Sequence, residues 1–148
     1  MKHEIEQDIG LDTSMSPEIS AKTGLNVDQV LEVITELIPP PEGDVDAPLK
    51  ALIFDSYYDS YRGVIVYFRI MEGTMRTGQT IKMMATGASY QIVECGHLLP
   101  LGLEPCDSLS AGEVGYFTAS IKTVSDTRIG DTITDAANPT AEPLPGYR

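Results

Sequence analysis

The pattern of apolar residues changes from a helical period to a strand period near residue 40. Spacings of three and four predict a helix that begins after Asn26, its predicted N-cap, and ends before the three prolines at 39–41. Its apolar stripe consists of Val27, Val30, Leu31, Ile34, Leu37 and Ile38. A shorter helix is predicted at residues 4–9, where Gly10 ends it.

From Pro48 onward apolar and polar residues alternate, and ten of the thirteen glycines follow residue 47. This pattern predicts short strands separated by glycine turns. The predicted strands are 49–58, 64–71, 80–85, 90–95 and 114–122. A set of short strands of this kind favours a closed antiparallel β-barrel, because closure removes exposed strand edges. The fold class predicted is therefore mainly β.

The apolar stripe of the second helix has few partners within residues 1–38, so this segment reads as the end of a larger domain. We expect it to be partly frayed or packed on a neighbour. Residues 39–47, rich in proline, glycine and acid, are the predicted linker. Residues 48–140 are the predicted barrel.

Net charge is −12, of which residues 1–46 contribute −9. The chain therefore lacks the basic balance of a nucleic-acid binder, and strong autonomous binding of nucleic acid is not expected. No apolar run reaches the ~18 residues of a membrane-spanning helix, and no secretory signal opens the chain. These features predict a soluble intracellular chain, in which Cys95 and Cys106 are free thiols.

Residues 73–80 almost match the phosphate-binding loop G-x-x-x-x-G-K-[ST], but Gln79 replaces the lysine. A phosphate loop must also open a helix, whereas residues 81–84 continue as a strand pattern. We therefore predict a strand–turn–strand here, in which both glycines supply unusual backbone angles.

No catalytic triad or metal site is predicted. His97 with Asp107 and Ser108 or Ser110 makes a triad on paper only, since no nucleophile elbow is present. His3 and His97 have no second ligand at metal-binding spacing.

Ser20, Ala21 and Lys22 follow a candidate strand at 17–19 and precede the second helix. In this order they resemble the guanine-specificity loop of Ras-like GTP-binding proteins, where backbone amides meet the guanine oxygen. The first segment is accordingly interpreted as a short α/β remnant of a Ras-like GTP-binding domain.

The second segment resembles domain II of translational GTPases. Residues 73–81 look like the family's G-x-(hydrophobic)-K-x-G-D-x-(hydrophobic) hairpin, with Arg76 in place of lysine and Gln79 in place of aspartate. Both departures lie at turn positions and are expected to leave the hairpin intact. Residues 110–115 and 129–132 resemble two further signatures of the family.

The finer resemblance is to the elongation factor 4 (LepA) family, and it extends from about Glu4 to Arg148. The stretches that carry it are residues 38–41, 47–56, 58–64, 113–116 and 138–146. It implies a fragment without catalytic residues, in which residues 141–148 begin the connection to the next domain. The parent would bind GTP and magnesium, hydrolyse GTP and remodel the ribosome–tRNA complex by back-translocation.

The resemblance also implies partners and contacts. The barrel would dock on the ribosome, chiefly the small subunit, with tRNA contacted indirectly and the rest of the parent GTPase as a further partner. The contact residues suggested are Arg62, Gly63, Arg69, Arg76 and Lys82. A solvated barrel surface is the alternative for each of them. The implied location is the cytoplasm, with a peripheral membrane association or, in a eukaryote, an organelle matrix as alternatives.

Three other classes remain open from the sequence: the barrel of another translational GTPase, a self-standing barrel that binds proteins, and a barrel enzyme with a flavin. The acidic first third favours the protein-binding module, and no motif for a flavin site is present.

Overall fold

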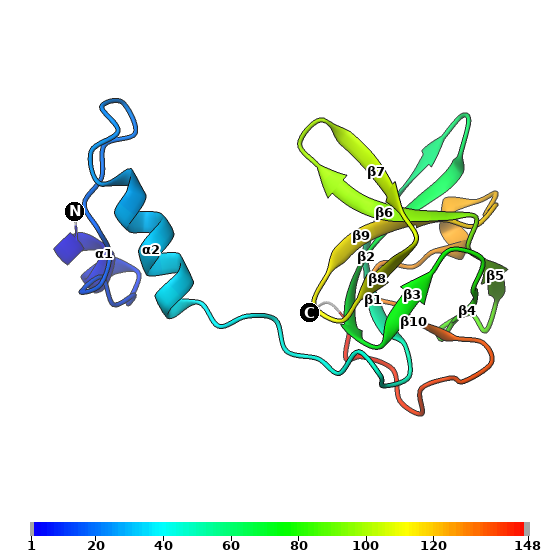
Figure 1. The fold of residues 1–148 in the computed structure, drawn as a ribbon. Coiled ribbons are helices and arrows are strands. Elements are labelled where there is room, and N and C mark those ends of the chain that lie inside the picture. Colours follow the sequence, from blue (N-terminus) through cyan, green and yellow to red (C-terminus); the bar gives the residue numbers. More distant parts are fainter. Residues whose placement is uncertain (1, 147–148) are drawn as a thin grey trace. The chain divides into compact units, whose positions relative to one another are not determined.

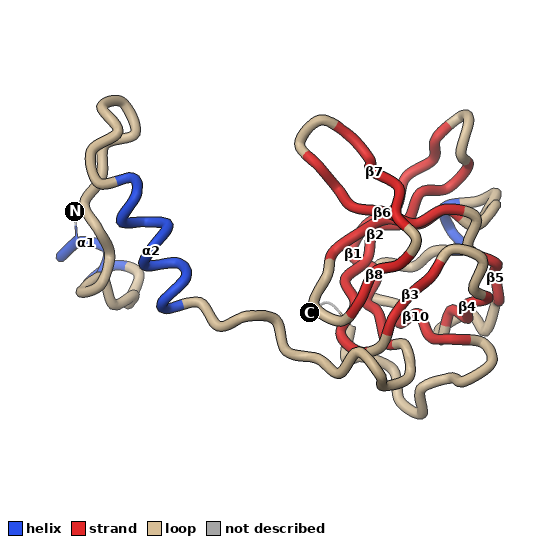
Figure 2. The backbone as a smooth tube through the Cα atoms, in the orientation of Figure 1, coloured by secondary structure: helices blue, strands red, loops and turns tan. Residues whose placement is uncertain are grey.

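The structure is a computed structural model, and it describes residues 2–146. The chain forms two compact units, Met1–Pro40 and Pro41–Arg148. Among the described residues, two α-helices lie in the first unit and every strand lies in the second (Figures 1 and 2). The domain boundaries drawn from the sequence stay a prediction.

The first unit holds α1 (Lys2–Asp8) and α2 (Val27–Leu37). Gly10 ends the first helical segment as predicted, because its φ of 76° is left-handed and its N–H donates to the Glu6 carbonyl at 3.2 Å. Asn26 occupies the predicted N-cap position of α2, but its side chain makes no capping hydrogen bond. Asn26 itself has a φ of 54°, and its side-chain amide donates to the Glu18 carbonyl at 2.9 Å instead of capping α2.

The apolar stripe of α2 is largely uncovered. Leu31 is 62% exposed and Leu37 is 52% exposed, and no residue of α2 is buried. A helix of eleven residues gains most of its stability from packing, so an open stripe leaves α2 weakly held. The expectation that this stripe finds few partners within its own segment is confirmed.

The second unit is built from ten strands and one short 3₁₀ helix, η1 (Val124–Asp126). The strands are β1 (Lys50–Asp59), β2 (Gly63–Glu72), β3 (Thr74–Arg76), β4 (Thr80–Met83), β5 (Ser89–Gln91), β6 (Glu94–Leu99), β7 (Gly102–Cys106), β8 (Ser108–Ser110), β9 (Val114–Thr118) and β10 (Thr132–Asp135). Every pairing between them is antiparallel. The mainly β class is therefore confirmed.

The strand pairing does not confirm a closed barrel. Eight strands form one sheet in the order β5-β4-β10-β1-β2-β9-β6-β7, and β3 pairs with β8 separately. Met75 of β3 and Leu109 of β8 are buried in the same core as the strands of the larger sheet. Backbone hydrogen bonds also tie β2 to the turn between β8 and β9, because Ile70 accepts from Gly112 N at 2.8 Å and donates to Glu113 O at 2.9 Å. The strands thus wrap around one core, but the ladders leave β5 and β7 as edges.

The core lies along the inner face of β2. Val66, Phe68 and Ile70 are completely buried, and the ring of Phe68 packs against that of Phe117 from β9 at a centroid distance of 5.6 Å. Arg69, which lies between Phe68 and Ile70, is exposed. This alternation is expected of a strand that has one buried face and one solvent-exposed face.

The strand predictions succeed where the alternation is long. The predicted strands 49–58 and 64–71 correspond to β1 and β2. The predicted strand 90–95 is wrong as one element, because residues 92 and 93 separate β5 from β6. Strand β3 lies within the predicted strand–turn–strand at 73–80, whereas β7, β8 and β10, of three to five residues, were not predicted.

Residues 73–80 form no phosphate loop, since β4 follows them where such a loop requires a helix. The predicted strand–turn–strand is present as β3, a turn and β4, but the expected hairpin is not formed, because β3 pairs with β8 whereas β4 pairs with β5 and β10. The side-chain oxygen of Gln79 accepts from the Arg76 N–H at 2.9 Å, and its amide donates to Asp135 at 2.5 Å. Gln79 therefore closes the turn and also ties it to β10.

The residues on either side of the strands pack against them. Asp44 O accepts from the Gly73 N–H at 2.7 Å, so the start of this unit is fixed to the end of β2. Residues 140 and 144 are hydrogen-bonded to β10, where the Thr132 hydroxyl accepts from Leu144 N and the Thr134 hydroxyl accepts from Thr140 N, both at 2.8 Å.

Gly73 and Gly78 provide a matched test of this packing. Both have a positive φ, so alanine at either costs about 1–2 kcal/mol of strain. Only Gly73 is crowded, because a Cβ there would lie 2.7 Å from Ala47 O, whereas nothing lies within 4 Å at Gly78. We expect Gly73→Ala to lower the free energy of unfolding by about 3 kcal/mol, and Gly78→Ala by about 1 kcal/mol, in urea titrations. Equal losses would contradict the crowded contact.

Candidate functional site

Ser20, Ala21 and Lys22 lie in a turn and not after a strand. The predicted strand at 17–19 is wrong, since only an isolated bridge joins Ser20 to Leu25. The turn is closed by Gly24 N donating to Ser20 O at 2.9 Å, and Ala21 and Lys22 are exposed. The loop is thus preformed, with the Lys22 side chain open to solvent.

Arg62 and Gly63 lie at the turn between β1 and β2. The carboxylate of Asp59 shapes this turn by accepting from the N–H groups of Tyr61 and Arg62, both at 2.8 Å. These two hydrogen bonds, that from Arg62 first, lower the pKa of Asp59. The Arg62 guanidinium also forms an ion pair with the Glu94 carboxylate at 3.5 Å, which ties the turn to β6. Tyr61, which the sequence did not single out, is 97% exposed.

Arg69, Arg76 and Lys82 are exposed residues of three different strands, β2, β3 and β4. Register places Arg76 opposite Ser108 and Lys82 opposite Thr134. Within residues 2–146 no hydrogen bond or ion pair brings these three side chains together. The three basic side chains are therefore separate and do not form a cluster.

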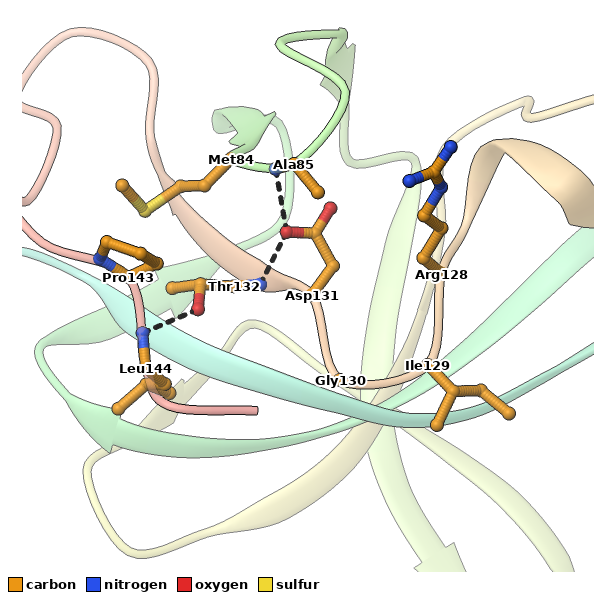
Figure 3. A pocket seen from close by; sticks show the side chains of 9 residues that line it. All are labelled: Met84, Ala85, Arg128, Ile129, Gly130, Asp131, Thr132, Pro143 and Leu144. Atoms are coloured by element: carbon orange, nitrogen blue, oxygen red, sulfur yellow. Dashed lines mark hydrogen bonds between the residues drawn. The ribbon is translucent and has the colours of Figure 1, made fainter. Parts of the chain in front are cut away.

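A cavity of about 420 Å³ lies where the ends of β4 and β10 meet the segment that contains Pro143 and Leu144 (Figure 3). Its lining residues are Met84, Ala85, Arg128, Ile129, Gly130, Asp131, Thr132, Pro143 and Leu144. Asp131, only 6% exposed, accepts through one oxygen from the N–H groups of Ala85 at 2.8 Å and Thr132 at 2.7 Å. Its other oxygen, Oδ2, is buried without a hydrogen-bond partner in the part of the chain that the structure describes.

His97 is paired with a carboxylate that the sequence did not suggest. Its Nε2 lies 3.0 Å from Glu113 Oε1, and Glu113 Oε2 accepts from the backbone N–H of Ser110 at 2.6 Å. These contacts, the one with His97 first, lower the pKa of Glu113. Ser110 contributes its backbone N–H and not its hydroxyl. The triad of His97, Asp107 and a serine that the sequence offered is therefore not assembled.

Among residues 2–146 no group of three or more potential ligands is arranged to hold a metal ion. In the same residues no helix is long and apolar enough to cross a membrane.

The fold is that of a translation-factor β domain. A crystal structure of translation elongation factor SelB from Methanococcus maripaludis matches 80% of this chain and 25% of its own, with a TM-score of 0.67 and 19% identity. A bacterial selenocysteine-specific elongation factor, EF-Sec, matches 91% of this chain and 22% of its own, with a TM-score of 0.66 and 15% identity. The family model described as "Elongation factor Tu domain 2" matches residues 63–134.

Comparison of the sequence with those of known proteins identifies, among translation factors, the ones that it matches over its whole length. Elongation factor 4 of Acetivibrio thermocellus is 60% identical over all 148 residues, and that of Alkaliphilus oremlandii is 62% identical over the same length. That of Thermosynechococcus vestitus is 58% identical over 147 residues. Over its whole length the chain matches elongation factor 4, which confirms the resemblance found in the sequence. It spans about a quarter of the length of these relatives, 24% in each case.

Asp131 offers a test of the cavity region. Asp131→Ala removes the acceptor of two backbone N–H groups, and we expect it to lower the free energy of unfolding by about 2 kcal/mol. Asp131→Asn keeps an oxygen for both N–H groups and replaces the unpartnered oxygen with an amide, so its loss should stay below about 1 kcal/mol. Urea denaturation of both variants measures this difference. A larger loss for asparagine than for alanine would contradict the assigned hydrogen bonds.

Proposed function

We propose that this chain is a non-catalytic, ribosome-docking segment of a translational GTPase. Its identity of about 60% to elongation factor 4 over the whole of its length carries this proposal. The whole protein then binds GTP with magnesium, hydrolyses GTP and remodels the ribosome–tRNA complex by back-translocation. Its place is the cytoplasm, where translation occurs.

The second unit is the docking part, and its strands act as a closed barrel that relays the nucleotide state to the ribosome. A surface that docks on RNA needs a rigid support, because scattered side chains position phosphates only when their backbones are fixed. The completely buried core residues of β2 provide that support.

The surface chemistry suits a small number of phosphate contacts on the small ribosomal subunit. Arg69, Arg76 and Lys82 are exposed on separate strands, so each reaches its own phosphate. At the turn between β1 and β2, Tyr61 is 97% exposed, and an exposed aromatic ring is suited to stack on an unpaired base. Contact with tRNA is then indirect.

The first unit supplies one part of a guanine site. The preformed turn at Ser20, Ala21 and Lys22 offers backbone amides and a lysine stem to the base, as its resemblance to the specificity loop implies. Most of the binding energy for a nucleoside triphosphate comes from its phosphates and magnesium. The chain alone therefore binds guanine nucleotides weakly and does not hydrolyse them.

Ribosome docking is tested by co-sedimentation of the purified chain with separated ribosomal subunits at several salt concentrations. We expect a preference for small over large subunits at low salt, and weaker binding for the single variants Arg69→Ala, Arg76→Ala and Lys82→Ala. Each lost phosphate contact should lower the slope of log affinity against log salt by about 1. Lys122→Ala, which removes another exposed lysine, is the matched control and should leave the slope unchanged.

Two outcomes would refute the proposal. One is equal binding of all four variants and the wild type to both subunits. The other is hydrolysis of GTP above background by the purified chain, because the segment would then carry a catalytic site of its own.

A further inference from the structure

The only two cysteines of the chain lie directly opposite each other on neighbouring strands. Cys95 of β6 is the register partner of Cys106 of β7. Directly opposed residues of an antiparallel pair have Cα atoms about 4.5–5.5 Å apart. That separation falls within the range of about 4.4–6.8 Å that a disulfide spans. No backbone rearrangement is therefore needed to join the two sulfurs.

The two thiols differ in access. Cys95 is completely buried, and its sulfur lies 3.3 Å from the Thr77 hydroxyl. Cys106 is partly exposed and lines an open cavity of about 300 Å³ together with Val93, Glu94 and Pro105. A small oxidant in solvent thus reaches Cys106 first, and Cys95 stands behind it as the second thiol.

We propose that Cys95 and Cys106 form an oxidative modification site, at which hydrogen peroxide converts the two thiols into an intramolecular disulfide. The Cys106 sulfur attacks one peroxide oxygen, the O–O bond breaks, and hydroxide leaves as water after taking a proton. The Cys95 sulfur then attacks the sulfenic sulfur of Cys106, the S–O bond breaks, and a second water leaves. Two thiols lose two electrons in total, and one peroxide is reduced to two waters.

The surroundings of Cys106 slow its first reaction with peroxide. Burial raises the pKa of the Cys106 thiol, and the neighbouring Cys95 raises it further through its charge and a hydrogen bond. A thiol with a raised pKa holds little thiolate at neutral pH, so its first step with peroxide is slow. Once sulfenic acid forms, the opposed Cys95 is the nearest thiol, which favours the disulfide over further oxidation.

The bond would fasten an edge of the sheet. Within residues 2–146 strand β7 pairs with β6 alone, and the hairpin of the two strands projects beyond the neighbouring strands (Figure 1). The Cys106 thiol also donates to the Ser108 carbonyl at 3.3 Å, and oxidation removes this hydrogen bond to β8. The modification therefore restrains β7 and releases one contact between β7 and β8.

The test uses the purified, fully reduced chain, treated with graded hydrogen peroxide and then with N-ethylmaleimide. Intact mass under non-reducing conditions should fall by two hydrogen atoms, with no maleimide added, and dithiothreitol should reverse the change. Peptide mapping should join the segments that contain Cys95 and Cys106, in a monomer. Cys95→Ser should instead carry Cys106 on to the sulfinic acid or into a disulfide between two chains, and Cys106→Ser should leave Cys95 unreacted.

Two results for the wild-type chain would overturn the proposal. One is oxidation of Cys106 to the sulfinic acid while Cys95 still takes up maleimide. The other is disulfide formation between separate chains only. Because both are read from the wild-type protein, they do not depend on whether either serine variant folds.

Discussion

Val66, Phe68 and Ile70 are completely buried on one face of β2, and the two strands beside β2 are positioned by their ladders to it. Nine register pairs join β1 to β2, and five join β2 to β9. Removal of a buried phenylalanine side chain such as that of Phe68 typically costs about 3–5 kcal/mol, a large part of the stability of a small domain. Every exposed side chain that we assign to docking depends on this one buried face.

The division between core and surface is compatible with the docking on RNA that we propose, although the chain as a whole is acidic. Residues 1–46 carry most of the net charge of −12, and the later residues are close to neutral. Arg69 is exposed, whereas the residues before and after it are buried. The alternation of side chains along a strand therefore places its charge at the surface. A few fixed charges of this kind suffice for positioning, although they do not make the unit basic.

The sequence predicted those parts of the fold whose pattern is local. Residues 64–71 show the strand period over eight positions and became β2. Strands β3 and β8, of three residues each, are too short to show a period and exist because they pair with each other. Asn26 has the residue type of a helix cap, but its left-handed backbone directs its side chain elsewhere.

The site was less predictable, because its contacts join residues that are distant in the chain. His97 meets Glu113 only because β6 pairs with β9 and places His97 opposite Gly115. Cys95 and Cys106 are eleven residues apart, and only the two-residue turn of the hairpin shows that they face each other. Basic residues, by contrast, were found at the surface as expected, since a charged side chain on a short strand seldom enters a core.

Native-state amide hydrogen exchange of the monomeric chain tests most directly the claim that one buried face supports the whole docking unit. We expect the amides of β1, β2 and β9 to exchange slowest and only through global unfolding. The amides of α2, whose apolar stripe is exposed, should exchange through local opening at far lower free energy. Protection of α2 equal to that of β2, or fast local exchange within β2, would contradict the claim.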